Sequence, residues 1–325
     1  MRHLIPKAAL VTAIIGMAPL SAMAQWPERP VTIVVPSGAG GGTDQTGRML
    51  AERLQDHFGQ PFNVVNQGQG GGVVGISSIK NADPDGYTLG VIFNFAHYSP
   101  MGQAEVNVED FTPIAQYNFD PAGFQVRSDS EWEDINQALD AIKAAPSDYV
   151  IACGGGCGGS WPMAVATMMD EYGVDVSQVR FISGQGAAAA LQDLAAGGVD
   201  VVPSSLPEAG PLIDSGRIKA LAVMGNERLE AFPDVPALQE STDMKLELGA
   251  WRGLIAPAGL PGGIVAELES AMNEITHDED WRQQMQDRGF GIQWRDSEAF
   301  NEFMLDQQDS VRAIIQTLGF ANGDS

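Results

Sequence analysis

Two glycine-rich turns, each placed directly after an apolar stretch and before a helical one, constrain the fold of this chain more than any other feature. The first runs from Pro36 to Asp44 and follows the β-branched run Val31–Val35. The second, Cys153–Ser160, follows the stretch Tyr149–Ala152. Continuous apolar strands of this kind are buried on both faces, as in a parallel sheet covered by helices. Glycine suits such turns because it adopts positive φ freely.

The rest of the chain continues this alternation of strands and helices. The predicted strands span residues 31–35, 62–65, 88–93, 124–126, 149–152, 179–182, 199–202, 220–223 and 251–256. The predicted helices span residues 45–58, 74–81, 135–144, 162–172, 187–196, 264–275, 278–288 and 297–318. The pattern predicts an α/β fold in which two lobes of similar plan each hold a mainly parallel sheet with flanking helices. We expect residues 25–122 and 225–325 to form lobe 1 and residues 123–224 to form lobe 2.

The first 24 residues have the features of an export signal. Arg2 and Lys7 precede the apolar run Ala8–Leu20, and Ala22-Met23-Ala24 is a small-residue cleavage site. The apolar run is too short to span a bilayer, which takes roughly 20 residues. The sequence therefore predicts cleavage after Ala24 and a periplasmic location.

The charge balance limits the partners of the chain. Its 42 acidic residues outnumber 18 basic ones, giving a net charge of −24. Nucleic acid and anionic membrane surfaces are excluded as partners by repulsion. We expect a monomer. An anionic ligand would have to be held by local dipoles against this long-range field, with salt screening beyond about 10 Å.

The first glycine-rich turn is a candidate anion site. Backbone N–H groups of such a turn, together with a helix N-terminus, form a concave site for negative charge. Thr43 or Asp44 can cap the helix. The alternative is a purely structural turn. A nucleotide loop is disfavoured because this turn lacks Gly-Lys-Ser/Thr and has Thr43 where the third glycine of G-x-G-x-x-G belongs. The candidate residues are Ser37, Gly38, Ala39, Gly40, Gly41, Gly42, Thr43 and Asp44.

The second turn occupies the equivalent position in the second lobe. Ser160 can donate a hydrogen bond or cap the helix that begins near Pro162. A third stretch opens the helix 187–196 and could line the same cleft. Paired helix starts of this kind suit a ligand held between two lobes. The candidate residues are Gly158, Gly159, Ser160, Ser183, Gly184, Gln185 and Gly186.

The two cysteines of the chain, Cys153 and Cys157, leave three alternatives open. An oxidising periplasm favours a local disulfide. Free thiols are the second alternative, and a metal site is the third, although two ligands rarely suffice for one.

Catalytic patterns are scarce. The sequence has no G-x-S-x-G motif and no cluster of metal ligands, so we expect no enzyme, metal or cofactor. An exported hydrolase with Ser160 or Cys157 as nucleophile remains an alternative, but neither residue has an evident base. A receptor that signals to a membrane kinase is another. His97 follows a predicted strand and could reach the cleft.

An ordered set of short motifs resembles the tripartite tricarboxylate transporter receptors, also called the Bug family. The matching segments are Trp26–Pro30, Gly40–Asp44, Asn66–Gly71, Pro84–Leu89, Phe111–Ala115, Gly197–Asp200, Gly216–Val223, Phe232–Pro236 and Gly253–Pro257. They cover the whole mature chain in order. Within the family, Ser183-Gly184 together with Gly40–Thr46 is most similar to the citrate-binding branch.

The resemblance implies a two-lobed periplasmic binding fold of type II character. It implies that a small carboxylate, most often a di- or tricarboxylate, is bound between the lobes and passed to a two-component membrane permease. It also implies ligand contacts beyond the glycine turns, at Asn94, Ser204 and Ser205. For a carboxylate bound in this way, we expect hydroxyl groups and the side facing Trp251 to shape the rest of the cleft. Cys153 and Cys157 stand where the family usually has serine and asparagine.

Overall fold

The computed structural model describes residues 26–153, 157–183, 186–317 and 319. The predicted signal peptide, residues 1–24, lies outside this part of the chain, as do the candidate site residues Gly184 and Gln185. Signal cleavage after Ala24 therefore stays a prediction.

Strands and helices alternate through the described residues. The strands are β1 (Val31–Val35), β2 (Phe62–Asn66), β3 (Thr88–Ile92), β4 (Phe111–Arg127), β5 (Val150–Ala152), β6 (Arg180–Ile182), β7 (Val202–Ser205), β8 (Ile218–Val223), β9 (Gly249–Pro257) and β10 (Ile292–Arg295). The α-helices are α1 (Gly42–Phe58), α2 (Val73–Lys80), α3 (Ile135–Ala144), α4 (Ser160–Tyr172), α5 (Ala187–Ala196), α6 (Leu206–Asp214), α7 (Leu238–Ser241), α8 (Gly262–His277), α9 (Glu279–Asp287) and α10 (Ser297–Thr317).

The α/β architecture with two lobes is confirmed, but its sheets are mixed rather than mainly parallel. β1 pairs in parallel with β2 and β3, and β5 pairs in parallel with β6. β9 enters antiparallel between β3 and β4, and β10, β7 and β8 all pair antiparallel with β4. β4 and β9 are antiparallel because the chain passes between the lobes in opposite directions along them.

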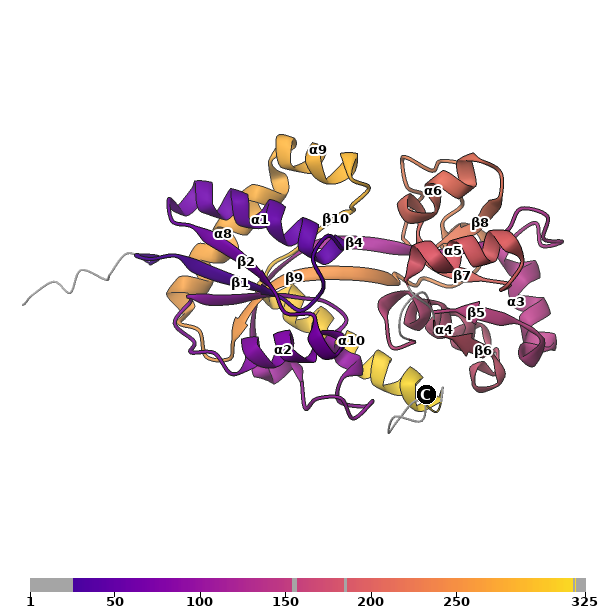
Figure 1. Cartoon of the computed structure of the whole chain (residues 1–325), viewed down its shortest axis with the longest axis horizontal. Helices are drawn as coiled ribbons and strands as arrows, with labels where there is room; N and C mark the ends of the chain where they lie inside the picture. The colour runs from indigo at the N-terminus through magenta and orange to yellow at the C-terminus, as the bar shows by residue number, and fades with distance from the viewer. Residues whose placement is uncertain (1–25, 154–156, 184–185, 318, 320–325) are drawn as a thin grey trace, which may run out of the picture.

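One long strand, β4, joins the two lobes (Figure 1). Its residues from Phe111 to Pro121 pair with β9, whereas Ala122–Gln125 pair with β7. The residues that follow β8 and precede β9 are hydrogen-bonded to β4 at this change of partner. Ala122 N–H donates to Leu248 O, and Met224 N–H donates to Ala122 O. In Figure 1, β1–β3, α1, α2 and α8 lie on one side of this crossing, and β5–β8 with α3–α6 lie on the other.

Helices cover both faces of the sheet in the first lobe. Ile33 and Val35 of β1 pack into a core with α1, α8 and α9, whereas Val34 points into a core with α2 and α10. Successive side chains of a strand alternate between faces, so an unbroken apolar run supplies both cores. This two-sided burial fixes the end of β1, where the first glycine turn begins.

Several elements differ from the sequence-based prediction. β4 is far longer than the predicted strand 124–126. Pro113 and Pro121 are local signals against a strand, but β4 tolerates them because they sit where its register shifts or its pairing partner changes. β7 begins at Val202, where the prediction placed the end of a strand. α6 and β10 were not predicted, and α6 contains Pro207 and Pro211.

None of the helices described is both long and apolar enough to cross a membrane. Within residues 26–153, 157–183, 186–317 and 319, no group of three or more histidine, cysteine or acidic side chains could hold a metal ion.

Candidate functional site

The first glycine turn leads straight into α1. The helix starts at Gly42, three residues earlier than predicted, and its N-cap is Gly41 in an extended conformation with φ −75° and ψ 168°. The expected capping by Thr43 or Asp44 is therefore wrong, because both residues lie in the first helical turn. A glycine N-cap has no side chain to accept hydrogen bonds from the first N–H groups of the helix, which remain directed out of the helix end.

Asp44 holds the turn instead of capping the helix. Its carboxylate accepts hydrogen bonds from Gly40 N–H at 2.8 Å and from Asn66 Nδ2 at 2.9 Å, and it pairs with Arg48 at 2.9 Å. Burial works to raise the pKa of Asp44, but the bonds from Gly40, Arg48 and Asn66 outweigh it and keep that pKa below its usual value. The side chain is buried, so Asp44 shapes the turn while Gly38, Ala39, Gly40 and Gly41 stay exposed.

Ser37 begins the turn beside a second glycine-rich segment. A Cβ atom on Gly68 would lie 2.7 Å from Ser37 C and 2.8 Å from Gly38 N, so only glycine permits this contact. Ser37 Oγ and Gln67 Oε1 are buried without a hydrogen-bond partner among the described residues. This end of the turn therefore carries two polar atoms that ordered water could satisfy.

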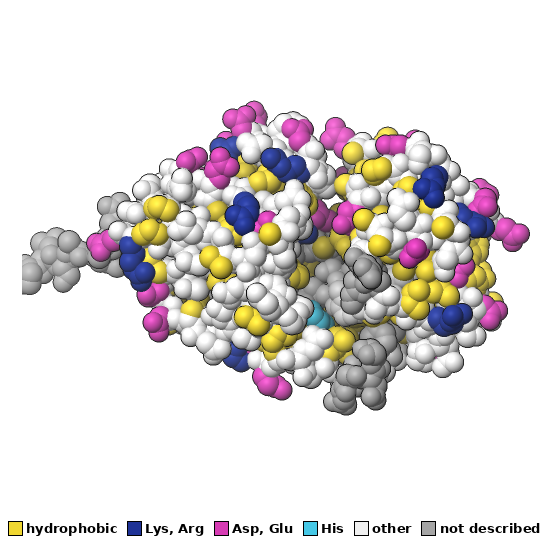
Figure 2. Space-filling view, in the orientation of Figure 1, with side chains coloured by type: hydrophobic (Ala, Val, Ile, Leu, Met, Phe, Trp, Pro, Cys, Tyr) yellow, Lys and Arg dark blue, Asp and Glu magenta, His cyan; other side chains and the backbone are white. Residues whose placement is uncertain are grey.

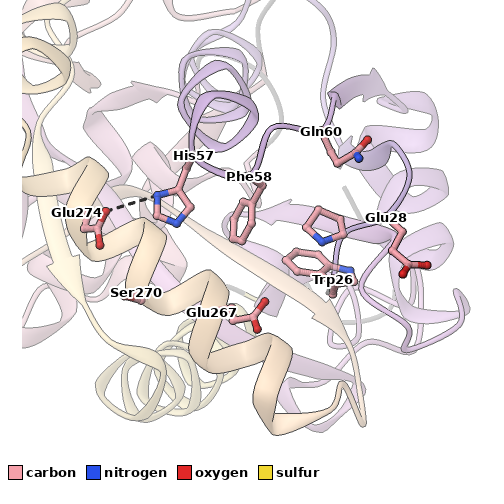
Figure 3. Close-up of a pocket in the computed structure, with 9 residues that line it drawn as sticks. Trp26, Glu28, His57, Phe58, Gln60, Glu267, Ser270 and Glu274 are labelled. Atoms are coloured by element: carbon pink, nitrogen blue, oxygen red, sulfur yellow. Dashed lines mark ion pairs between the residues drawn. The ribbon is translucent and has the colours of Figure 1, made fainter. Parts of the chain in front are cut away.

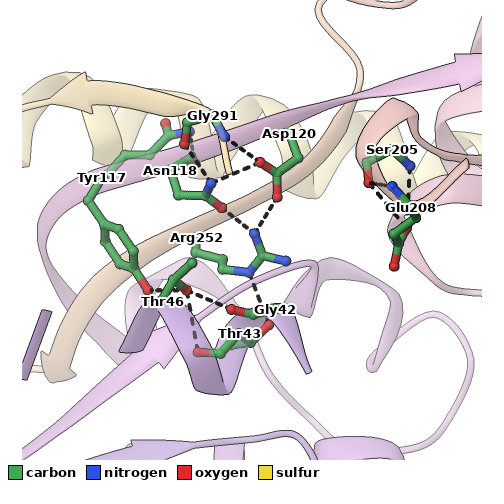
Figure 4. A network of polar contacts seen from close by, with 11 residues as sticks. Gly42, Thr43, Thr46, Tyr117, Asn118, Asp120, Ser205, Glu208, Arg252 and Gly291 are labelled. Atoms are coloured by element: carbon green, nitrogen blue, oxygen red, sulfur yellow. Dashed lines mark hydrogen bonds and ion pairs between the residues drawn. The ribbon is translucent and has the colours of Figure 1, made fainter. Parts of the chain in front are cut away.

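A buried arginine, Arg252 of β9, lies against the start of α1 (Figure 4). Its Nε donates to Thr43 Oγ1 at 3.1 Å, and its Nη1 donates to Asp120 Oδ2 at 2.6 Å and to Asn118 Oδ1. A Cβ atom on Gly42 would lie only 2.7 Å from Arg252 Nη2. The guanidinium group is thus in van der Waals contact with the first residue of the helix.

The second glycine turn meets the first lobe directly. Asn94, which follows β3 and is 6% exposed, donates from Nδ2 to Gly158 O at 2.7 Å. A Cβ atom on Gly158 would lie 2.7 Å from Met101 Sδ and 3.2 Å from His97 Cδ2. Two predicted site residues from different lobes are therefore in contact, and glycine is required at the contact.

His97 lies beside this contact but adds no positive charge to it. Its Nδ1 is 2.5 Å from Asn94 O. Burial lowers the pKa of His97 to about 4, although the hydrogen bond to Asn94 acts in the opposite direction. The imidazole is therefore neutral at pH 7.

α4 begins as α1 does. It starts at Ser160, and its N-cap is Gly159 with φ −68° and ψ 164° and no side-chain cap. Ser160 is therefore the first helical residue rather than a cap for a helix starting near Pro162. Both Gly159 and Ser160 are half-buried.

The structure joins Cys153 and Cys157 by a disulfide with a sequence separation of 4. Cys157 Sγ lies 3.5 Å from Ser183 Oγ, and Cys153 N–H donates to Ile182 O at 2.8 Å. The bridge therefore stands between the ends of β5 and β6, beside exposed Ser183. Gly186 forms the N-cap of α5 with a φ of 121°, a value that favours glycine.

Ser204 and Ser205 are buried and already hydrogen-bonded. Ser204 Oγ donates to Ser205 O at 3.2 Å, while Ser205 Oγ accepts from Glu208 N–H at 3.4 Å as the N-cap of α6. Glu208 is exposed as a whole residue, but the surrounding protein partly desolvates its carboxylate. This desolvation raises the pKa of Glu208, and the charge of Asp120 adds to the rise. The implied ligand contacts at these serines would require their hydroxyl groups to exchange partners.

The described residues form a hollow between the lobes and pockets elsewhere on the surface. Figure 2 shows the surface hollowed where the two lobes meet. A separate pocket of about 690 Å³ lies between the end of α1 and α8 (Figure 3). Glu28, Glu267 and Glu274 line that pocket, and Glu274 pairs with His57 at 3.5 Å. Three carboxylates disfavour an anionic ligand there, so we take the hollow between the lobes as the candidate site.

Sequence reasoning missed the polar cluster under the first turn and misjudged Trp251. Arg252, Asn118 and Asp120 gave a weak signal, since a single arginine interrupts an apolar strand and the other two residues share one face of β4. Trp251 does not shape the cleft, because it is 2% exposed and packs edge-on against Phe95.

The family comparison decides the identity. Residues 46–320 match the model described as "Tripartite tricarboxylate transporter family receptor". The chain belongs to this family. The resemblance to tripartite tricarboxylate transporter receptors in the sequence is thus confirmed, and the match includes the second glycine turn but begins just after the first, which ends at Asp44.

Individual relatives agree with this family assignment. Protein BugT of Bordetella pertussis is 27% identical over 279 residues, covering 84% of each chain. The crystal structure of a TctC solute binding protein from Polaromonas, without ligand, is 32% identical with a TM-score of 0.78 and covers 90% of this chain and 99% of its own. MatC from Rhodopseudomonas palustris with bound malate is 27% identical with a TM-score of 0.71, covering 89% and 100%.

These receptors of the TctC family are solute-binding proteins rather than enzymes. The hydrolase alternative, with Ser160 or Cys157 as nucleophile, is therefore set aside. The disulfide also leaves Cys157 without the free thiol that a cysteine nucleophile would need.

Proposed function

We propose that this receptor captures a small di- or tricarboxylate between its two lobes and delivers it to a tripartite tricarboxylate-type membrane transporter in the bacterial envelope. The observation that carries the proposal is the pair of helices, α1 and α4, that begin at uncapped glycines Gly41 and Gly159. Each helix start has unsatisfied N–H groups and a partial positive charge, which favour a carboxylate.

Contacts between the lobes support a shared site. Asn94 reaches Gly158 O, so the turn after β3 and the start of α4 meet. The change of pairing partner between Pro121 and Ala122 supports the division into residues 25–122 with 225–325 and residues 123–224. On this division, ligand contacts from Ser37–Asp44 come from one lobe, and contacts from Gly158–Ser160 and the start of α5 come from the other.

The energetics allow such binding despite the net charge of −24. A hydrogen bond from a backbone N–H to a carboxylate contributes about 1.5–3 kcal/mol. A few such bonds can support micromolar affinity, which is about −8 kcal/mol. The malate in the related receptor MatC is a dicarboxylate of the expected size.

A thermal-shift screen tests the binding step. We expect malate, citrate or another di- or tricarboxylate to raise the melting temperature in a concentration-dependent way, since only the native state binds. Putrescine, which is cationic, and glucose, which is uncharged, serve as controls and should leave the melting temperature unchanged. Absence of a shift with every carboxylate up to millimolar concentration contradicts the proposal. Uptake of the stabilising acid by cells with and without the permease then tests delivery. Uptake that is the same without the permease argues for a sensory role of the receptor.

A further inference from the structure

A buried polar cluster fastens the start of α1 to the strand that joins the lobes (Figure 4). Arg252 and Asp120 are 7% and 5% exposed, and their ion pair measures 2.6 Å. Asp120 Oδ1 also accepts from Gly291 N–H at 2.8 Å and from Asn118 Nδ2 at 3.1 Å. Every oxygen of this carboxylate is engaged, so its position is fixed by the strands around it.

The same arginine holds the ligand turn. Its Nε donates to Thr43 Oγ1, and the guanidinium lies against Gly42. One turn further along, Thr46 Oγ1 is 3.2 Å from the hydroxyl of Tyr117, which is also on β4. The first two turns of α1 are therefore linked to β4 at two points, through Arg252 and through Tyr117. Only the link through Arg252 involves charged groups.

Asp120 lies directly before the point where β4 changes partners. Residues up to Pro121 pair with β9 of the first lobe, and Ala122 pairs with Ser205 of the second. Any rotation of the lobes must twist β4 here. A shift of the ligand turn therefore reaches the crossing through three side chains, Thr43, Arg252 and Asp120.

We infer that the Arg252–Asp120 pair is a positioning element that holds the first glycine turn in its ligand-binding geometry and couples carboxylate binding to closure of the lobes. This inference rests on the proposed function. Arginine suits the role because its planar group donates in two directions at once, toward Thr43 and toward Asp120, whereas lysine offers a single point of charge. An ion pair used only for stability could be replaced by apolar side chains at little cost.

The experiment measures malate and citrate affinity by calorimetry, melting temperature, and the decrease in radius of gyration on ligand addition by X-ray scattering. We expect Arg252→Met and Asp120→Asn to weaken binding about tenfold, within the range of coupling between sites, and to reduce closure at saturating ligand. Arg252→Lys should recover melting temperature more than affinity, because the pairing with Asp120 returns without the bond to Thr43.

Controls separate positioning from general stability. Arg295→Met removes another partly buried pair on the same sheet, with Glu247 at 3.2 Å, and Tyr117→Phe removes the uncharged tie to Thr46. Both should keep affinity within about twofold, well under the range of coupling between sites. Unchanged affinity and closure in folded Arg252→Lys and Asp120→Asn overturn the inference, as does an equal loss in Arg295→Met. If the wild-type protein binds no carboxylate, the proposed function fails first and this inference fails with it.

Discussion

Asn94 and Gly158 form a hydrogen bond between the two lobes, with the Asn94 amide donating to the Gly158 carbonyl at 2.7 Å. Asn94 follows β3 and Gly158 precedes α4, so the bond joins the two turns that the proposed ligand must contact. The buried carbonyl depends on this donor, and glycine at position 158 allows Met101 to approach it.

Replacing Asn94 with alanine tests this bond. The change should lower the free energy of unfolding by about 1–3 kcal/mol, the cost of leaving a buried acceptor unpaired, and should weaken carboxylate binding. Asn136→Ala is a matched control because its amide also donates to a backbone carbonyl, Ser241 O at 2.6 Å, away from the turns. Urea unfolding and calorimetry give both quantities. Equal affinity losses in the two variants would contradict a role for Asn94 in the site.

Asp44 should make stability depend on pH in the acid range. Because its folded pKa lies below the usual 3.8, its contribution is fully present above that value and is lost as pH falls through the folded pKa. Asp44→Asn should cost about 1–3 kcal/mol at pH 7, and the difference from wild type should shrink below about pH 3.8.

The matched control for Asp44 is Asp134→Asn, at the N-cap of α3. It should leave carboxylate affinity unchanged, whereas Asp44→Asn should weaken it by loosening Gly40. Guanidinium unfolding at pH 7 and pH 3 measures the stability difference. A difference for Asp44→Asn that stays constant with pH would show that the lowered pKa does not contribute.

Gly41 and Gly42 should respond differently to alanine. At Gly42 a Cβ atom meets Arg252 Nη2 at 2.7 Å and Phe290 Cε1 at 3.1 Å, while at Gly41 the nearest atom is Gly38 O at 3.7 Å. We expect Gly42→Ala to cost about 1–3 kcal/mol by overpacking, and Gly41→Ala to change stability by under about 1 kcal/mol. Thermal unfolding of both variants checks this, and equal costs would mean that Arg252 yields easily.

The disulfide should contribute modestly to stability. Closing a loop with a sequence separation of 4 between Cys153 and Cys157 restricts the unfolded chain by about 2 kcal/mol. The double substitution Cys153→Ser with Cys157→Ser should lose about this amount in urea unfolding. Reducing agent should lower wild-type stability similarly and leave the variant unaffected. A reductant effect on the variant would show that the loss has another origin.

Elements with a strong local pattern could be predicted from the sequence. β1 and the helix after it were found because Val31–Val35 is uniformly apolar and the next residues have helical spacing. β4 and α6 were not, because Pro113, Pro121, Pro207 and Pro211 are local signals against strand and helix that tertiary pairing overrides.

The site divides in the same way. The glycine turns follow from local sequence, whereas Asn94, Ser204 and Ser205 came only from the family resemblance. The Arg252–Asp120 pair joins residues 132 positions apart. A single arginine in β9 does not indicate its partner, so no local pattern could reveal this contact.

The continuity of β4 has a mechanical consequence. No flexible loop separates the lobes at Pro121–Ala122, since the strand remains paired with β9 on one side and with β7 and β8 on the other. Opening must therefore wind or unwind a hydrogen-bonded ribbon about its own axis. Such a ribbon behaves as a torsion spring with a preferred resting angle, so an empty receptor should oscillate narrowly around one shape instead of swinging freely.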